Sequence, residues 1–129
     1  MIVYKVVTTP NNGDGYISCR IPEGNPFSLR YFVGVPTRAP RAINRLAPIM
    51  AFRSISAAQD FMRSDDILFK AEAKPSRKRV TYIVTRLRDL SLIRAFWGGR
   101  ARPELMLVPL GTVACSELTL LEMITHDRL

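Results

Sequence analysis

Short runs of β-branched and aromatic residues recur along this chain, and residues that favour turns separate them. Such runs predict strands, because branched and aromatic side chains pack well on a pleated surface. The first run covers residues 2–7, and Asn-Asn-Gly-Asp-Gly follows it at 11–15. Asn and Gly tolerate positive φ, so the chain should turn there and return antiparallel over residues 16–21. We therefore expect an N-terminal β-hairpin.

Further strands are expected along the rest of the chain. Three prolines, at positions 36, 40 and 48, each remove a backbone donor and restrict the preceding residue, so the stretch between them should be irregular. The last apolar segment is ambiguous, since residues 118–123 could also be helical. The strand segments that we predict after the hairpin are 29–35, 49–52, 67–73, 80–85, 105–108 and 113–124.

Two short segments have helical composition. In the first, residues 57–63, Ser56 followed by Gln59 fits a capping box with Ser56 as the N-cap. The second covers residues 89–97, with Asp89 as a possible N-cap and two glycines as its stop. Strands and helices do not alternate strictly, which favours a mainly antiparallel sheet over a doubly wound parallel one. The predicted fold class is α+β, with about six or seven strands and two short helices.

The size and the cysteines point to one ordinary domain over residues 1–129. A chain of 129 residues, 47% of them apolar, can bury a core without staples. Cys19 and Cys115 are too few and too far apart for a disulfide framework, a CxxC pair or a zinc site, so we expect buried thiols. A signal-peptide pattern is missing, as is any run of about 18 uncharged apolar residues. We expect a cytoplasmic protein without a membrane partner.

The positive charge is concentrated in one part of the sequence. Residues 74–102 hold nine basic side chains and one acid, Asp89, whereas ten basic and ten acidic side chains cancel elsewhere. Fifteen of the nineteen basic residues are arginine, whose planar fork binds a phosphate or carboxylate through two hydrogen bonds. This pattern predicts a polyanionic partner, either nucleic acid or an acidic protein. The contact residues that we predict are Arg77, Lys78, Arg79, Arg86, Arg88, Arg100 and Arg102.

Aromatic residues lie among these charges. Tyr82, Phe96 and Trp97 would suit single-stranded nucleic acid, because bases stack on aromatic rings while arginines neutralise phosphates. The alternative is that these rings belong to the core and the arginines form a solvated face. Together with the small size of the chain, the concentrated charge favours a small, basic, non-enzymatic binding protein, such as a viral or mobile-element accessory protein.

Signatures of common enzyme classes are missing from the sequence. Its one histidine, His126, lies close to the C-terminus, where segments tend to fray. A glycine-rich phosphate loop and an H-E-x-x-H motif are not found either. The binding hypothesis accordingly includes no metal and no cofactor.

Three short segments together suggest an alternative. They are Tyr4-Lys5, the run 52–56 of Phe-Arg-Ser-Ile-Ser, and the run 103–112, which begins Pro-Glu. Their order resembles the ADP-ribosyltransferase superfamily, whose members bind NAD. The resemblance implies that Ser54 positions the cofactor and that Glu104 is the catalytic carboxylate, which stabilises the positive charge that develops as nicotinamide leaves.

The chain departs from that family at three positions. Lys5 stands where the family has arginine or histidine, Ile55 replaces a threonine, and Arg102 replaces a second glutamate or glutamine. Ser54 and Ser56 also have a simpler interpretation as turn and N-cap residues. The alternative function is therefore an ADP-ribosyltransferase-like domain, active or degenerate.

Overall fold

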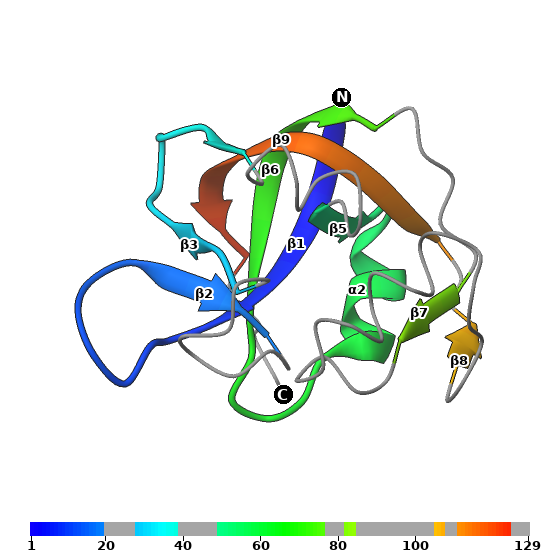
Figure 1. Ribbon diagram of the computed structural model, residues 1–129, viewed down its shortest axis with the longest axis horizontal. Coiled ribbons are helices and arrows are strands. Elements are labelled where there is room, and N and C mark those ends of the chain that lie inside the picture. Colours follow the sequence, from blue (N-terminus) through cyan, green and yellow to red (C-terminus); the bar gives the residue numbers. More distant parts are fainter. Residues whose placement is uncertain (20–27, 39–48, 77–81, 85–104, 108–110, 125–129) are drawn as a thin grey trace.

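The computed structural model describes residues 1–19, 28–38, 49–76, 82–84, 105–107 and 111–124 (Figure 1). Every strand pairing within these ranges is antiparallel. The elements in chain order are β1 (Ile2–Thr8), β2 (Tyr16–Ser18), β3 (Arg30–Tyr31), β4 (Thr37–Arg38), β5 (Ile49–Phe52), α2 (Ile55–Phe61), β6 (Ile67–Pro75), β7 (Tyr82–Val84), β8 (Leu105–Leu107) and β9 (Thr112–Met123).

Four strands close into a ring. The long strand β6 pairs with β1 along one edge and with β9 along the other. The short strand β5 also pairs with both β1 and β9, on their other edges. The order β1, β6, β9, β5 therefore returns to β1 and forms a small barrel. Beside the ring, β2 pairs with β1, β3 pairs with β2, and β4 pairs with β9. Figure 1 shows β1 and β6 side by side, with β9 curving across them.

The predicted N-terminal hairpin is confirmed. In its turn, Gly13 and Gly15 both have φ of 81°, and a Cβ at Gly15 would lie 2.6 Å from the backbone oxygen of Tyr31. Glycine is therefore required at Gly15 by both conformation and space. The side chain of Arg30 fixes the turn, because its Nη1 donates to the Asp14 carbonyl at 2.6 Å and its Nη2 to the Asn12 carbonyl at 3.1 Å.

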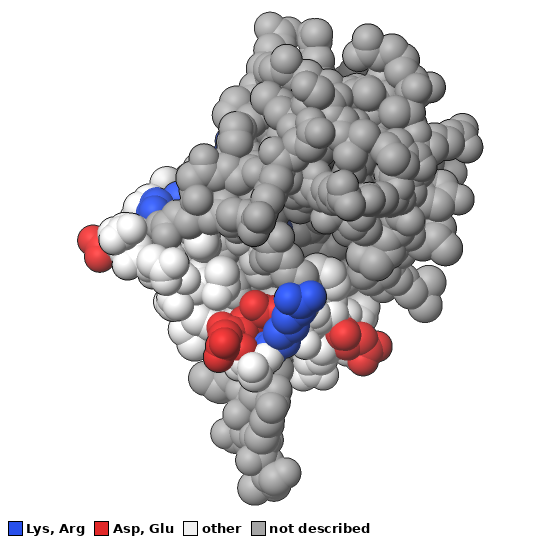
Figure 2. All heavy atoms as spheres, turned by 60° about the horizontal axis from the view of Figure 1, so that its bottom comes forward, with Lys and Arg blue, Asp and Glu red and all other residues white. Residues whose placement is uncertain are grey.

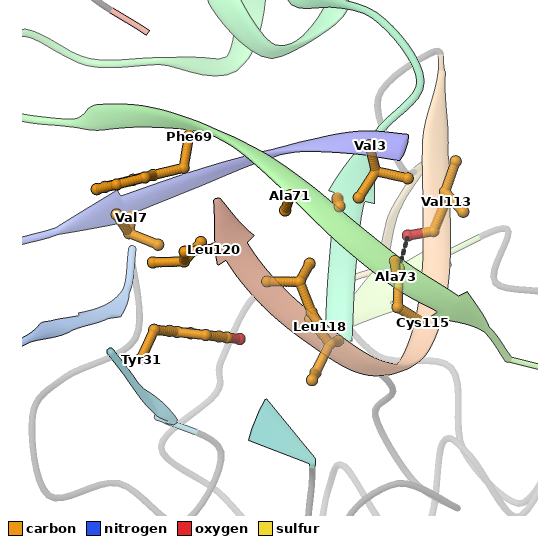
Figure 3. Packing of buried hydrophobic residues seen from close by; sticks show 12 residues of the cluster. Val3, Val7, Tyr31, Phe69, Ala71, Ala73, Val113, Cys115, Leu118 and Leu120 are labelled. Atoms are coloured by element: carbon orange, nitrogen blue, oxygen red, sulfur yellow. Dashed lines mark hydrogen bonds between the residues drawn. The ribbon is translucent and has the colours of Figure 1, made fainter. Parts of the chain in front are cut away.

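The barrel encloses the main core. Alternate residues of β1, β6 and β9 point inward, as the two-residue period of a strand requires. Tyr16 adds an edge-to-face contact with Phe69, at 4.8 Å between ring centroids. Figure 3 shows this interior cluster, which consists of Val3, Val7, Tyr31, Ile49, Ala51, Phe69, Ala71, Ala73, Val113, Cys115, Leu118 and Leu120.

Helix α2 covers part of the outside of the barrel. A second apolar cluster lies there, made of Val6 from β1, Phe52 from β5, Leu68 from β6 and Ala58 from α2. Phe61, at the end of the helix, contacts Phe52 with 5.1 Å between ring centroids. Strands β1, β5 and β6 are therefore packed on both faces near the helix, where consecutive residues such as Val6–Val7, Ala51–Phe52 and Leu68–Phe69 are buried.

Strand β9 contains two irregularities in its pairing with β6, and one of them keeps core residues on the same face. The pairing with β6 shifts between Lys74 and Pro75 and again between Lys70 and Ala71. At the first shift, one extra residue of β9, Ser116, separates the pair positions. Cys115 and Leu118 are three residues apart, an odd number, yet both face the core because the bulge absorbs one residue. The helical alternative for residues 118–123 is therefore wrong.

The α+β prediction is correct for the antiparallel sheet and differs in helix content. The described residues are predominantly β, with α2 as their single helix. The predicted helix over residues 89–97 lies outside these residues. The first predicted helix, over residues 57–63, corresponds to α2 at Ile55–Phe61.

The N-cap of α2 is Ser54, so the prediction of Ser56 is wrong. Ser54 has an extended backbone, with φ of −136° and ψ of 157°, and its side chain accepts a hydrogen bond from the backbone N–H of Ala57. Ser56 already lies in the first turn, where its hydroxyl is 3.3 Å from that of Ser54. The helix consequently begins at Ile55, two residues before the predicted start at residue 57.

The segment around Pro36 also differs from its prediction. The expected strand over residues 29–35 is reduced to β3, because Gly34 adopts φ of 81° and turns the chain. Strand β4 then follows directly after Pro36, in a stretch predicted to be irregular. Pairing with β9 forms this short strand, so tertiary contacts outweighed the local effect of the proline.

Two further predictions concern the burial of the cysteines and the presence of a membrane-spanning helix. Cys19 and Cys115 are not joined in a disulfide; Cys115 is buried, as predicted, and Cys19 is only partly buried. Burial raises the pKa of the Cys115 thiol, although the nearby Lys5 acts in the opposite direction. Within the described ranges, no helix is long and apolar enough to span a membrane.

Candidate functional site

The charges of the described residues balance. These residues contain seven basic and seven acidic side chains, whereas the remaining segments contain twelve basic and four acidic ones. The whole net charge of +8 therefore belongs to the segments outside the described ranges. The barrel itself is a neutral support for strongly basic segments.

The outer surface of β6 and β9 shows how the barrel charges compensate each other. Lys70 of β6 lies 3.9 Å from Glu122 of β9, and the N-terminal ammonium group lies 2.7 Å from Glu72. On the face seen in Figure 2, basic and acidic atoms of the described residues lie close together and do not form separate patches of one sign. Cross-strand ion pairs of this kind are typical of a solvated barrel surface.

The most connected charges form the Glu117 cluster, which comprises Arg38, Lys74 and Glu117. Arg38 of β4 and Lys74 of β6 are the direct register partners of Glu117 on the two edges of β9. Arg38 Nε lies 2.6 Å from Glu117 Oε1, and Lys74 Nζ lies 3.2 Å from Glu117 Oε2. Each carboxylate oxygen therefore binds a different cation.

The Glu117 cluster carries one net positive charge on an exposed surface. The side chain of Glu117 is only 15% exposed, whereas those of Arg38 and Lys74 are 70% and 67% exposed. Hydrogen bonds from Arg38 and then from Lys74 hold the pKa of Glu117 below its ordinary value. At neutral pH the carboxylate is ionised, and it holds two outward-facing cations beside each other.

The basic stretch 74–102 starts at this cluster. Where β6 ends, the backbone N–H of Ser76 donates to the Ala114 carbonyl at 2.8 Å, and the hydroxyl of Ser116 donates to the Lys74 carbonyl at 3.3 Å. These bonds fix the point from which the chain continues to residue 77. The start of the stretch is therefore part of the rigid barrel wall.

A separate two-stranded ladder joins both ends of segment 85–104. Strand β7 pairs antiparallel with β8, and Val84, the last residue of β7, is the register partner of Leu105, the first residue of β8. The two residues that border the segment are therefore direct neighbours.

All seven predicted contact residues lie outside the described part of the chain. These are Arg77, Lys78, Arg79, Arg86, Arg88, Arg100 and Arg102. Of the aromatic residues proposed for base stacking, Tyr82 lies in β7, and Phe96 and Trp97 are not among the described residues. The predicted contact set stays a prediction.

Two of the three positions that resemble ADP-ribosyltransferases are described. Lys5 is buried in the barrel, where its Nζ donates to the Met50 carbonyl at 2.7 Å and lies 5.5 Å from the centroid of the Tyr31 ring. The hydroxyl of Tyr31 is also buried and has no hydrogen-bond partner among the described residues. Ser54 lies at the exposed start of α2, where it caps the helix. Glu104 lies outside the described ranges.

Comparisons with known proteins give no further indication of function. Family models, curated proteins and solved structures were all searched, and none of them matches this chain. The described residues also contain no group of His, Cys, Asp or Glu side chains placed to hold a metal ion. The resemblance to ADP-ribosyltransferases therefore stays a prediction, and the interpretation of function depends on the chain's own charges and contacts.

The sequence pattern did not single out Arg38 or Glu117. Arg38 was counted among the charges that cancel, and 79 residues separate it from Glu117. Their contact depends on the register between β4 and β9, for which the linear sequence contains no signal.

Proposed function

We propose that this protein is a small, non-enzymatic nucleic-acid-binding protein whose neutral barrel presents the basic stretch 74–102 to phosphate groups. The observation that carries the proposal is the separation of charge, with seven basic and seven acidic side chains in the described barrel and an excess of eight positive charges elsewhere. Concentrated like charges repel each other, so a polyanionic partner would relieve that repulsion. The predominance of arginine favours phosphate as the anion.

The β7–β8 ladder supports a shared binding region. Arg86 follows Val84 by two residues, and Arg102 precedes Leu105 by three. These separations along the chain are short, so each arginine is close in sequence to a paired strand end. Connectivity thus favours arginines from both ends of segment 85–104 in one region, although they are 16 positions apart.

The test is binding of fluorescein-labelled oligonucleotides, measured by fluorescence anisotropy at about 50 to 200 mM salt. Single-stranded DNA, the matching duplex and single-stranded RNA should be compared. We expect affinity to fall steeply with salt, and replacement of Arg77, Lys78 and Arg79 by alanine to lower the slope by about 2 for a single strand. The control is the double variant Arg53→Ala/Arg63→Ala, which removes two exposed arginines of the neutral barrel and should leave the slope nearly unchanged.

Three results would contradict the proposal or part of it. If the wild-type protein binds none of the three oligonucleotides at the lowest salt, the proposal is wrong. If it binds poly-glutamate but no nucleic acid, an acidic protein is the partner, because a basic surface attracts carboxylates as well as phosphates. If the control double variant loses as much affinity as the triple variant, binding depends on total charge and the stretch 74–102 has no special role.

A further inference from the structure

We infer that Arg38, which lies on β4 and outside the basic stretch, is an additional phosphate-contacting residue that Glu117 holds beside Lys74. The inference rests on the proposed function and extends its surface across β9. Three adjacent strands supply the three members of the Glu117 cluster, and their register brings the side chains together.

Glu117 fixes the relative position of the two cations. Because Arg38 Nε and Lys74 Nζ bind the two oxygens of one carboxylate at 2.6 and 3.2 Å, these nitrogens lie within roughly 8 Å of each other. Glu117 is the least exposed of the three side chains, so the anion forms the base of the cluster and the cations form its rim. Two positive groups at this separation can contact one phosphate or two neighbouring phosphates.

The hydrogen-bonding geometry of Arg38 leaves its outer edge available. Nε donates to Glu117, and within the described part of the chain neither Nη1 nor Nη2 has a partner. A guanidinium has five N–H donors in a rigid fork, and the two Nη groups together match two oxygens of a phosphate. An arginine held through Nε and 70% exposed is therefore already oriented for bidentate phosphate binding.

The position of the cluster links it to the basic stretch. Lys74 is both a member of the cluster and the first residue of the stretch, and its carbonyl accepts a hydrogen bond from Ser116 of β9. A nucleic-acid strand bound by the stretch would therefore meet the Glu117 cluster at the barrel wall. If Arg38 had only a structural role, its replacement would leave the salt dependence of binding unchanged. An exposed ion pair adds little to stability and does not contact the ligand.

The experiment compares Arg38→Ala, Arg38→Lys and the control Arg63→Ala with the wild type, using a fluorescein-labelled single-stranded oligothymidylate. Arg63 is also an exposed arginine, but it precedes the start of β6, whereas Lys74 is close to its end. Arg38→Ala should weaken binding about three- to tenfold at low salt and lower the salt slope by about 0.7, the contribution of one phosphate contact. Arg38→Lys should restore the slope but only part of the affinity, because lysine lacks the fork. Arg63→Ala should match the wild type.

The outcomes separate this inference from the proposed function. If Arg38→Ala binds like the wild type while the Arg77, Lys78 and Arg79 triple variant is weakened, the inference fails and the proposed function stands. If Arg38→Lys binds as tightly as the wild type, the bidentate contact is refuted. If Arg63→Ala loses as much affinity as Arg38→Ala, binding depends on the total charge of the protein and the inference is wrong. A wild-type protein that binds no oligonucleotide overturns both, and unchanged circular dichroism and melting show that each variant is folded.

Discussion

Substituting Ser54 by alanine tests which serine begins the helix α2. In the structure, the Ser54 hydroxyl accepts a hydrogen bond from the backbone N–H of Ala57 at 3.1 Å, and the Ser54 carbonyl accepts the first helical bond from Ala58 at 3.2 Å. Alanine keeps the second bond and removes the first. The N–H of Ala57 then depends on water, because it precedes the first residue that can form a bond inside the helix.

The expected loss of stability follows from the exposure of the cap and the packing of the helix. Replacing a serine N-cap by alanine costs about 0.5 to 2 kcal/mol. Ser54 is exposed, so water replaces part of the lost bond, but α2 has only seven residues and brings Ala58 and Phe61 onto the second apolar cluster. We therefore expect a loss of about 1 kcal/mol in the free energy of unfolding, or a decrease of about 3 to 5 °C in Tm.

The assay is urea unfolding followed by circular dichroism, with Ser56→Ala as the matched control. Ser56 is also an exposed serine in the same turn, but its hydroxyl does not cap a backbone N–H in the structure. Its loss should change the free energy of unfolding by less than about 0.5 kcal/mol. Ser54→Asp should keep most of the stability, since aspartate is an equally good N-cap. If Ser56→Ala costs as much as Ser54→Ala, or more, the capping assignment is refuted.

Two further predictions concern the barrel. Arg38 and Lys74 lower the folded-state pKa of Glu117, so its stabilising contribution is present above its ordinary pKa of 4.5 and is lost as the pH falls through the lowered folded value. In urea unfolding, Glu117→Gln should therefore have a lower free energy of unfolding than the wild type at pH 7 and nearly the same value at strongly acidic pH. An equal loss of stability at both pH values would contradict the lowered pKa of Glu117. Leu118 is fully buried, and Leu118→Ala should cost about 2 to 5 kcal/mol. Leu121→Ala, an exposed leucine of the same strand, should cost less than about 0.5 kcal/mol, and similar losses in both variants would show that the assigned strand faces are wrong.

The parts of the fold that the sequence predicts well are those with strong local signals. The first hairpin, β5, β6 and the long strand β9 follow from branched and aromatic residues and from the glycines at the first turn. The ring itself does not follow from local signals, because the register partners of β1 and β6 are at least 60 residues apart in the chain. A bulge such as that at Ser116 is also invisible in the sequence, since it is selected by the core residues on either side of it.

The candidate site shows the same division between local and distant information. The amount of positive charge and its position along the chain can be read from the sequence. The proposed function follows from this distribution of charge. The partners of individual charges cannot be counted in this way. Lys74 looked like one more unpaired cation of the basic stretch, yet it shares the carboxylate of Glu117 with Arg38 because three strands meet in register.

The pairing of β6 with β9 has a consequence for how this protein can change during evolution. These two strands hold each other directly, although residues 76–111 lie between them in the chain. The entropy of closing a loop grows slowly with its length, by about 0.6 kcal/mol for each doubling. Insertions, deletions and substitutions between β6 and β9 should therefore accumulate with little effect on the barrel. Relatives of this protein would then share the ring of strands and differ most in the segment that we propose to contact nucleic acid.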